Sequence, residues 1–467
     1  MKYDDVIEEI SGYVTEDRTF SEDTLDIALL ILKDSMGCMI KSLDNPQCQK
    51  MLGPAEEGDY RKNGIPVPGI SRPLGLLDAS WNLGLLVRWL DYNDCFLAEE
   101  WGHPSDNLGG ILAAAYSVSS RGKKLTVSDV LTTMVKAHEI QGVLSLTNSL
   151  NRVGYDHVFF VKLATAGVTS KLLGGDEEKV QNTVSNVFAD GAALRTYRHA
   201  PNVTTRKSWA AGDASMRGVR LALLTDKLSE GYPNILSEAD WGFNKNIMNG
   251  ADITLSKKLD NYVVNNILFK ADFPAEFHAQ TGAEAAMELN RKYHGKLSAV
   301  EEIKVSTHES AIRIIAGKEE LKNPSDRDHS LEYIIAVSLL NGDLKTEYYA
   351  DEYHENHPEI NRLISKMTVE ENEQYSKDYL DPAKRSVSNA VRLVFEDGTE
   401  SEEMEVEYPI GHKFRRDEVR PVIDRKFVSN LNSRFDKEKI GSIENMFDDK
   451  RSLMNMDICD FMYEFQG

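Results

Sequence analysis

The sequence predicts a mainly α-helical protein with an inserted α+β domain, that is, a large all-helical domain and a smaller α+β lid. Helical patterns run from the N-terminus to about residue 230, alternating patterns typical of strands appear only after about residue 300, and helical patterns return after about residue 416. A chain of 467 residues is also long enough for two domains. We therefore expect residues 1–254 and 413–467 to form the helical domain and residues 255–412 to form the lid.

Helices and one long loop are expected near the N-terminus. Residues 22–40 open with two acidic residues and then carry apolar residues along one face, which is typical of a helix that packs on a core. Ser42 to Pro73 are predicted to form a loop, because prolines at positions 46, 54, 66, 68 and 73 exclude a continuous helix.

Two further helices are predicted together with their ends. Thr126 is a candidate N-cap, and Asp129 suits the third helical position, where a carboxylate returns a hydrogen bond to the cap. The apolar face that follows includes His138, which we interpret as a core residue with satisfied hydrogen bonds. The second helix is expected from Phe159 to Leu173, because the pair Gly174-Gly175 is a natural stop.

The patterns of the lid domain predict a strand, a helix and a hairpin. EEIKVSTHES, residues 301–310, alternates like a strand, and SLEYIIAVSLLNGD, residues 330–343, has the pattern of a helix that stops at Gly342. In residues 389–411, two alternating segments flank Asp397-Gly398, a pair typical of a tight turn between antiparallel strands.

The charge balance excludes several classes of function. With 54 Lys and Arg against 75 Asp and Glu, the chain carries a net charge of −21, which disfavours general binding to nucleic acid. No apolar segment is long enough to cross a membrane, so no membrane partner is expected. The acidic start MKYDDVIEEI has neither the apolar core of a signal peptide nor the arginines of a transit peptide, so we expect a cytoplasmic protein.

One stretch departs from this acidic composition. From Gly191 to Gly212 there is no carboxylate. The cationic or titratable residues of this stretch are Arg195, Arg198, His199, Arg206 and Lys207. The stretch is either a basic loop that pairs with acidic residues elsewhere, or a binding site for a small molecule with several negative charges. Arginine offers two parallel donors to a carboxylate and lysine offers a compact charge, so both suit such a ligand.

Three other segments combine residues that can transfer protons or bind anions. They are WLDYNDCFLAEEWGHPSDNLGG, NRVGYDHVFFVK and LFKADFPAEFHAQT, which begin at residues 89, 151 and 268. Their candidate residues are Asp91, Asp94, His103, His157, Lys270, Glu276 and His278. Each of these residues alone has an ordinary alternative as a helix cap, a solvated side chain or a core residue.

Eight segments carry a specific pattern in this order along the chain: EWGHPSDNLGGILAAA, KAHEIQG, NSLNRVGYDHV, LRTYRHAPN, RKSWAAGDA, FPAEFHAQT, NPSDRDH and YPIGH. Together they resemble the 2-methylcitrate dehydratases of the MmgE/PrpD family, from about residue 5 to residue 465. The family also includes cis-aconitate decarboxylases and an iminodisuccinate epimerase. LRTYRHAPN and RKSWAAGDA resemble the dehydratase branch.

This resemblance implies a homodimer of two-domain subunits, with an active site between the domains that acts on a tricarboxylate. The implied reaction removes water from 2-methylcitrate, and also from citrate, as in the methylcitrate cycle of propionate catabolism. The implied catalytic residues are Asp91, His103, His157 and Lys207. The residues expected to bind substrate are Arg198, His199, Arg206, Lys270, His278 and Tyr333.

Two positions depart from the family pattern. Cys95 follows DYND where a threonine is common, so a hydroxyl is missing there. Glu276 stands where decarboxylase relatives carry a histidine just after FPA, and His278 follows two residues later.

Dehydration needs a base for the proton next to a carboxylate, an acid for the leaving hydroxyl, and cations that stabilise the developing negative charge. We expect His103 and His157 to supply the base and the acid, in an order that the sequence leaves open. Lys207, with Arg206 or Lys270, is expected to hold carboxylates, and Asp91 to orient a histidine or contact the substrate hydroxyl. Two alternatives stay open: a related decarboxylase or isomerase, and a non-catalytic metabolite-binding protein.

No metal or cofactor is expected. The four cysteines are scattered and form no C-x-x-C pair, so neither an iron–sulfur cluster nor a zinc site or disulfide framework is suggested. The aspartates and histidines of the first two candidate segments have the donor atoms of a divalent-metal site. The neighbouring Arg206 and Lys207 would repel a cation and suit an anion instead.

Overall fold

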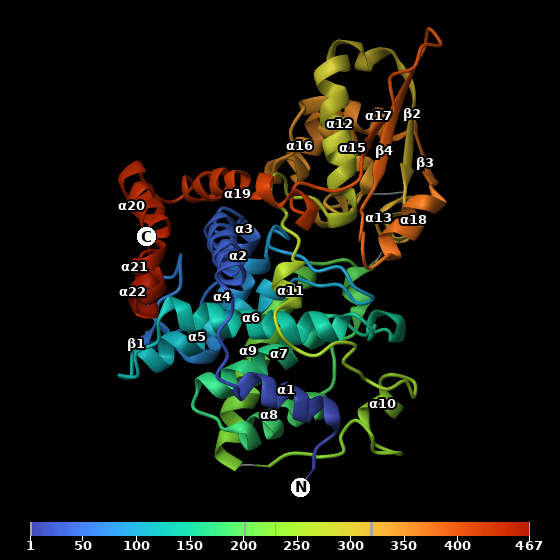
Figure 1. The fold of residues 1–467 in the computed structure, drawn as a ribbon. Helices are drawn as coiled ribbons and strands as arrows, with labels where there is room; N and C mark the ends of the chain where they lie inside the picture. The colour runs from blue at the N-terminus through green and yellow to red at the C-terminus, as the bar shows by residue number, and fades with distance from the viewer. Residues whose placement is uncertain (1, 200–201, 229, 318–320, 467) are drawn as a thin grey trace. The chain divides into compact units, whose positions relative to one another are not determined.

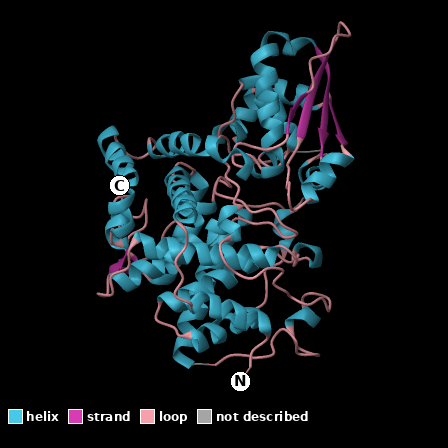
Figure 2. Cartoon of the chain, in the orientation of Figure 1, coloured by secondary structure: helices cyan, strands magenta, loops and turns pink. Residues whose placement is uncertain are grey.

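The predicted fold class is confirmed, because the chain is mainly α-helical with one small sheet (Figure 2). The computed structural model describes residues 2–199, 202–228, 230–317 and 321–466. Contacts divide the chain into two compact units, which we call the first and the second unit. The first unit comprises Met1–Ile267 and Ile423–Gly467, and the second comprises Leu268–Val422. The domain boundaries expected from the sequence stay a prediction.

The first unit consists almost entirely of helices (Figure 1). Its elements before the second unit are α1 (Asp5–Thr15), α2 (Glu22–Ser42), α3 (Pro46–Met51), β1 (Tyr60–Ile65), α4 (Leu76–Arg88), η1 (Pro104–Asn107), α5 (Leu108–Ser119), α6 (Val127–Ser145), α7 (Val158–Leu172), α8 (Glu177–Ala189), α9 (Arg206–Leu228), α10 (Phe243–Asn246) and α11 (Tyr262–Asn265). The C-terminal helices are α19 (Arg416–Leu431), which belongs to the second unit up to Val422 and to the first unit from Ile423, α20 (Lys437–Asp448), α21 (Lys450–Asn455) and α22 (Ile458–Tyr463).

The predicted helix ends are confirmed where local hydrogen bonds define them. Thr126 caps α6 in a reciprocal arrangement, in which its hydroxyl accepts from the Asp129 N–H at 3.3 Å and Asp129 Oδ2 accepts from the Thr126 N–H at 2.7 Å. After α7, Gly174 adopts a φ of 103°, which ends the helix.

The prediction of a loop from Ser42 to Pro73 is wrong in part, because this segment contains one short helix and one strand. Pro46 is the first residue of α3, a position at which the missing N–H removes no helical hydrogen bond. The side chain of Asn45 caps this turn by accepting two main-chain hydrogen bonds. Strand β1 forms isolated bridges to Leu74 at its two ends. The prolines still prevent a continuous helix.

Helices α4, α5 and α9 approach so closely that their main chains are in contact. A Cβ atom at Gly109 of α5 would lie 2.6 Å from the Cα atom of Gly84 and 2.7 Å from the carbonyl oxygen of Ser80 in α4. A Cβ atom at Gly212 of α9 would lie 2.8 Å from the main-chain nitrogen of Leu85. Only glycine permits this packing, which places the C-terminal end of α4 near the N-terminal half of α9.

The second unit packs helices against a four-stranded mixed sheet. Its elements are α12 (Gln280–Tyr293), β2 (Val300–Thr307), α13 (Glu309–Ile315), α14 (Pro324–Arg327), α15 (Leu331–Asn341), α16 (Asp351–Asn356), α17 (Glu359–Ile364), β3 (Met367–Glu371), α18 (Glu373–Leu380), β4 (Asn389–Phe395) and β5 (Met404–Val406). The strand order is β3-β2-β4-β5, in which only β2 and β3 are parallel. Apolar residues of β2 and β4 share one core with α12 and α15.

The strand, the helix and the hairpin predicted for this unit are all present. β2 corresponds to the alternating segment from residue 301, and α15 ends before Gly342, which adopts a φ of 70°. β4 and β5 pair antiparallel with Val391 opposite Met404. Gly398 in the turn adopts a φ of 79°, as the Asp-Gly pair predicts.

We expect Gly109→Ala to lower the free energy of unfolding by about 1–3 kcal/mol, because the added methyl group meets main-chain atoms that no rotamer change can move. Urea unfolding followed by circular dichroism measures the loss. Gly441→Ala in α20 is the control, since no atom lies within 4 Å of its Cβ position and alanine favours a helix. Equal stability of wild type and Gly109→Ala would contradict the proposed helix contact.

Candidate active site

The segment that follows α4 presents Asp91 in an unusual backbone conformation. Asp91 adopts a φ of 51°, a left-handed conformation that costs a non-glycine residue about 1 kcal/mol. Arg88, the last residue of α4, donates from Nη1 to Asp91 Oδ1 at 2.5 Å, and both side chains are buried. This ion pair offsets the cost of the left-handed turn and sets the direction of the Asp91 carboxylate.

His103 lies directly before η1 and contacts the Asp91 segment through both ring nitrogens. Its backbone is extended, with a φ of −122° and a ψ of 93°, as a following proline requires. Nδ1 lies 2.7 Å from the carbonyl oxygen of Asp94, and Nε2 lies 3.5 Å from Asp91 Oδ1. A carbonyl oxygen can only accept, so Nδ1 carries a proton and Nε2 is the nitrogen that can gain or lose one.

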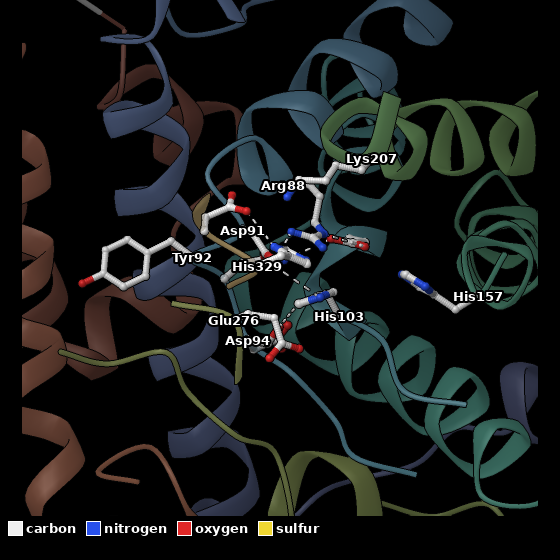
Figure 3. Close-up of polar contacts among 12 residues, drawn as sticks. Arg88, Asp91, Tyr92, Asp94, His103, His157, Lys207, Glu276 and His329 are labelled. Carbon is white, nitrogen blue, oxygen red and sulfur yellow. Dashed lines mark hydrogen bonds and ion pairs between the residues drawn. The ribbon is translucent and has the colours of Figure 1, made fainter. Parts of the chain in front are cut away.

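His157 stands at the N-terminus of α7 with its ring centroid 6.2 Å from that of His103. Figure 3 shows it pointing toward the region where Arg88, Asp91 and His103 lie. Its Nε2 is buried and has no hydrogen-bond partner among the residues that the structure describes. Burial, together with the nearby arginines, lowers its pKa well below the usual value although Asp156 opposes the shift. His157 is therefore a neutral imidazole at physiological pH.

Asp156 and Arg198 form a buried ion pair beside His157. Arg198 donates from Nε to Asp156 Oδ2 at 2.5 Å and from Nη2 to Oδ1 at 3.2 Å, and from Nη1 to the carbonyl oxygen of Lys207 at 3.3 Å. Burial opposes ionisation of Asp156, but the charges of Arg198 and Arg195 lower its pKa well below the usual range. Arg198 thus ties the start of α7 to the first turn of α9. Its predicted contact with substrate is untested, and this geometry favours a positioning role.

Arg195 lies between His157 and a buried glutamate. Its Nη1 is 3.5 Å from His157 Nδ1 and 3.7 Å from Glu100 Oε1. Glu100 is 1% exposed, and burial raises its pKa to about 7, although Arg195 and the Asn151 N–H favour the charged form. Near neutral pH the charge of Arg195 is therefore only partly compensated.

Arg206 and Lys207 begin α9 but have different surroundings. Lys207 is 5% exposed and lies in the region of Arg88 in Figure 3. The Arg206 guanidinium lies over the rings of Trp209 and Tyr197, at 4.3 Å and 5.2 Å from their centroids. It also lines a separate cavity of about 160 Å³ with Lys162 and other residues of α7 and α9. This geometry does not support the predicted role of Arg206 in holding the same carboxylate as Lys207.

Of the remaining residues predicted to bind substrate, His199 is exposed in the first unit, and the other three belong to the second unit. Lys270 is 1% exposed. His278 is fully buried, with Nδ1 at 2.9 Å from Glu276 Oε1 and Nε2 at 3.1 Å from the Tyr379 hydroxyl. Although burial opposes it, His278 lowers the pKa of Glu276, which is therefore a carboxylate.

Tyr333 lies in the core of the second unit rather than on a surface that a ligand reaches. It is fully buried, and its hydroxyl donates to the carbonyl oxygen of Tyr348 at 2.8 Å. Burial raises the pKa of this phenol, so it stays protonated. The geometry gives Tyr333 a packing role and does not support its predicted contact with substrate.

Several charged residues around the two histidines were not among the predicted site residues. They are Arg88, Glu100, Asp106 and Asp156, whereas Arg195 belongs to the predicted cationic stretch. One signal was available, because a stretch of cations without carboxylates needs partners from elsewhere in the chain, and Asp156 directly precedes His157.

Among the residues described, no three His, Cys, Asp or Glu side chains are grouped so that they could hold a metal ion.

Comparison with known protein families gives a direct assignment. A family model described as the MmgE/PrpD N-terminal domain matches residues 8–256, and one described as the MmgE/PrpD C-terminal domain matches residues 273–449. The chain belongs to the MmgE/PrpD family. The resemblance inferred from the eight sequence segments is therefore confirmed.

Individual members of the MmgE/PrpD family match almost the whole chain. It is 44% identical to the 2-methylcitrate dehydratase of Escherichia coli (strain K12), over 99% of this chain and 97% of that protein. It is 43% identical to the mitochondrial 2-methylcitrate dehydratase of Yarrowia lipolytica, over 98% of this chain and 89% of that protein. The 2-methylcitrate dehydratase of Cupriavidus necator is 45% identical, over 92% of this chain and 91% of that protein.

No helix of the described residues is long and apolar enough to cross a membrane.

Proposed function

We propose that this protein is a 2-methylcitrate dehydratase, a hydro-lyase that removes water from 2-methylcitrate to give 2-methyl-cis-aconitate. The relatives of that name match the chain over nearly its full length. The observation that carries the chemistry is the pairing of His103 Nε2 with the Asp91 carboxylate at 3.5 Å, close to a second histidine that is neutral. A decarboxylase, an isomerase and a non-catalytic binding protein are not favoured. The cytoplasmic location and the homodimer expected from the sequence remain proposals.

His103 is the residue that takes the proton next to the substrate carboxylate. Its Nδ1–H donates to the carbonyl oxygen of Asp94, so Nε2 is the basic nitrogen. When Nε2 takes up the proton, the ring becomes an imidazolium, and the Asp91 carboxylate stabilises this positive charge. The pair thus places a negative charge beside the nitrogen that becomes positive as the proton is transferred.

His157 assists departure of the hydroxyl group. A neutral imidazole carries one proton, and Arg195 Nη1, which can only donate, faces Nδ1. Asp156 Oδ1 also lies near Nδ1, at 3.4 Å, but it already accepts from Arg198 and from the Val158 N–H. The proton of His157 is therefore assigned to Nε2, from which it donates a hydrogen bond to the leaving hydroxyl. The proton that His103 takes from the substrate carbon completes the water molecule that leaves.

The cations of the first unit bind the carboxylates of the substrate. Removal of the proton places negative charge on the adjacent carboxylate, and a cation fixed beside it lowers the energy of the transition state. Lys207 is assigned this role, because it is buried and follows a segment without carboxylates. Arg88 and Arg195 add positive charge to the same region.

The direct test is incubation of the purified protein with 2-methylcitrate and with citrate, followed by ultraviolet absorbance of the conjugated product and by mass spectrometry. We expect loss of one water from 2-methylcitrate, with no release of carbon dioxide. Release of carbon dioxide from cis-aconitate would favour the decarboxylase. Binding of citrate without any turnover of either substrate would favour a non-catalytic protein.

We expect Lys207→Ala to lower kcat/KM for 2-methylcitrate by roughly 100- to 1,000-fold, because removal of one fixed donor to a developing charge has an effect of this size. Steady-state kinetics measure the loss, and circular dichroism checks the fold. Lys179→Ala is the control, since Lys179 is more exposed and pairs with Asp226 of α9. Wild-type activity in a folded Lys207→Ala protein would remove Lys207 from the mechanism.

We expect the activity to survive dialysis against EDTA under aerobic conditions. The two histidines lie among Arg88, Arg195 and Arg198, whose charges disfavour a bound metal cation. Protein groups supply the acid, the base and the positive charge in this mechanism. Activity that is lost on chelation and restored by iron or another metal would show that the proposal lacks a component.

A further inference from the structure

Asp94 lies between two histidines and makes four hydrogen bonds. Its carbonyl oxygen accepts from His103 Nδ1 at 2.7 Å. Its Oδ1 accepts from the Ser105 N–H at 3.0 Å and from the Ser105 hydroxyl at 2.6 Å. Its Oδ2 lies 2.9 Å from Nε2 of His138. Asp94 is 1% exposed. Through these buried contacts it holds His103 and Ser105 against the segment that precedes them.

His138 supports Asp94 from the interior of the first unit. His138 is a fully buried residue of α6, and its Nδ1 lies 2.9 Å from the carbonyl oxygen of Met134. Both ring nitrogens therefore face oxygen atoms that accept hydrogen bonds. The carbonyl oxygen of Met134 can only accept, so Nδ1 of His138 carries a proton, and Nε2 shares a hydrogen bond with the Asp94 carboxyl group. The expectation of a satisfied core histidine is met, and its partner is the segment that carries Asp91.

Asp94 has the contacts of a positioning group and not of a base. Its carboxylate oxygens accept three hydrogen bonds from protein groups, and it is buried. Its carbonyl oxygen accepts the Nδ1 proton of His103, so the position of this oxygen decides which nitrogen of His103 is basic. If the Asp94 side chain were released, the carbonyl oxygen would no longer be held at this distance.

We propose that Asp94, held by His138, is a positioning residue that keeps the proton of His103 on Nδ1 and thereby leaves Nε2 as the base beside Asp91. This inference rests on the proposed function, because it specifies how one catalytic residue of that reaction is held. It assigns no contact with substrate to Asp94 or His138.

Two substitutions separate positioning from charge. Asp94→Ala removes all three side-chain hydrogen bonds, and we expect kcat for 2-methylcitrate to fall at least tenfold with less than a threefold change in KM. Asp94→Asn keeps the hydrogen bonds, because its amide oxygen can accept from Ser105 while its amide NH₂ donates to a neutral His138. We therefore expect kcat of Asp94→Asn to stay within about threefold of wild type, because the hydrogen bonds to Ser105 and His138 remain.

Glu139→Ala is the matched control. Glu139 follows His138 in α6, is fully buried, and accepts from the N–H groups of Asp260 and Val263 at 3.0 Å and 2.8 Å. Its loss removes a buried carboxylate of similar type without touching the His103 segment. We expect this variant to unfold more easily than wild type while kcat stays unchanged. Ser105→Ala replaces Asp94→Ala if that variant does not fold. It removes one hydrogen bond to Asp94, so we expect a smaller fall in kcat.

An NMR readout is independent of activity. Nitrogen-15 spectra of labelled histidine, with His103 identified by its loss in His103→Gln, are expected to show a proton on Nδ1 in wild type and in Asp94→Asn. A mixture of both ring forms is expected in Asp94→Ala, or in Ser105→Ala if that variant takes its place.

The possible outcomes distinguish this inference from the proposed function. A wild-type protein that does not dehydrate 2-methylcitrate would refute the function, and the NMR spectra would still decide the position of the proton. An active wild type with unchanged kcat in folded Asp94→Ala would refute the positioning role. Equal impairment of Asp94→Asn and Asp94→Ala would also refute it, because the charge of Asp94 would then act directly.

Discussion

The candidate site depends on how residues 91–95, between α4 and η1, are held in place. Asp91 adopts a left-handed conformation, and its ion pair with Arg88 offsets the energetic cost of that conformation. The carbonyl oxygen of Tyr92 accepts from Lys426 Nζ at 2.7 Å, so the C-terminal part of the chain also secures this segment. Asp94 binds the residues on both sides of Pro104. Because each contact is buried, the carboxylate of Asp91 and the ring of His103 keep one relative geometry, which proton transfer requires.

An acidic protein creates a cationic site by keeping buried carboxyl groups neutral or already paired. Burial raises the pKa of both Glu100 and Asp106 to about 7, so neither carries a full negative charge near neutral pH. Asp156 does ionise, but Arg198 compensates it through two hydrogen bonds. The remaining positive charge of the arginines and of Lys207 suits a ligand with three carboxylates. The net charge of the chain therefore says little about the potential inside this site, which local pairing determines.

His103 and His157 acquire different properties from their surroundings. His103 has a carbonyl oxygen at Nδ1, which fixes its ring proton there, and a carboxylate beside Nε2, where a positive charge would develop. His157 is buried near arginines that lower its pKa, so it stays neutral and acts as a hydrogen-bond donor. Different environments thus separate a ring that exchanges a proton from a ring that only donates a hydrogen bond. The different partners of the two rings thus account for the division of roles in the proposed dehydration.

The sequence by itself determined the helices, the Thr126 cap, the Asp397-Gly398 hairpin and the family, because periodicity, caps and motifs act over a few neighbouring residues. It also identified Asp91, His103, His157 and Lys207 as candidates, whose roles remain proposals. Only the tertiary structure decided that Arg206 packs on aromatic rings, that Tyr333 is buried in a core, and that His138 binds an aspartate 44 positions away. These properties depend on partners that are distant in the chain. Side-chain protonation and direction follow from burial and from such contacts, which no local pattern encodes.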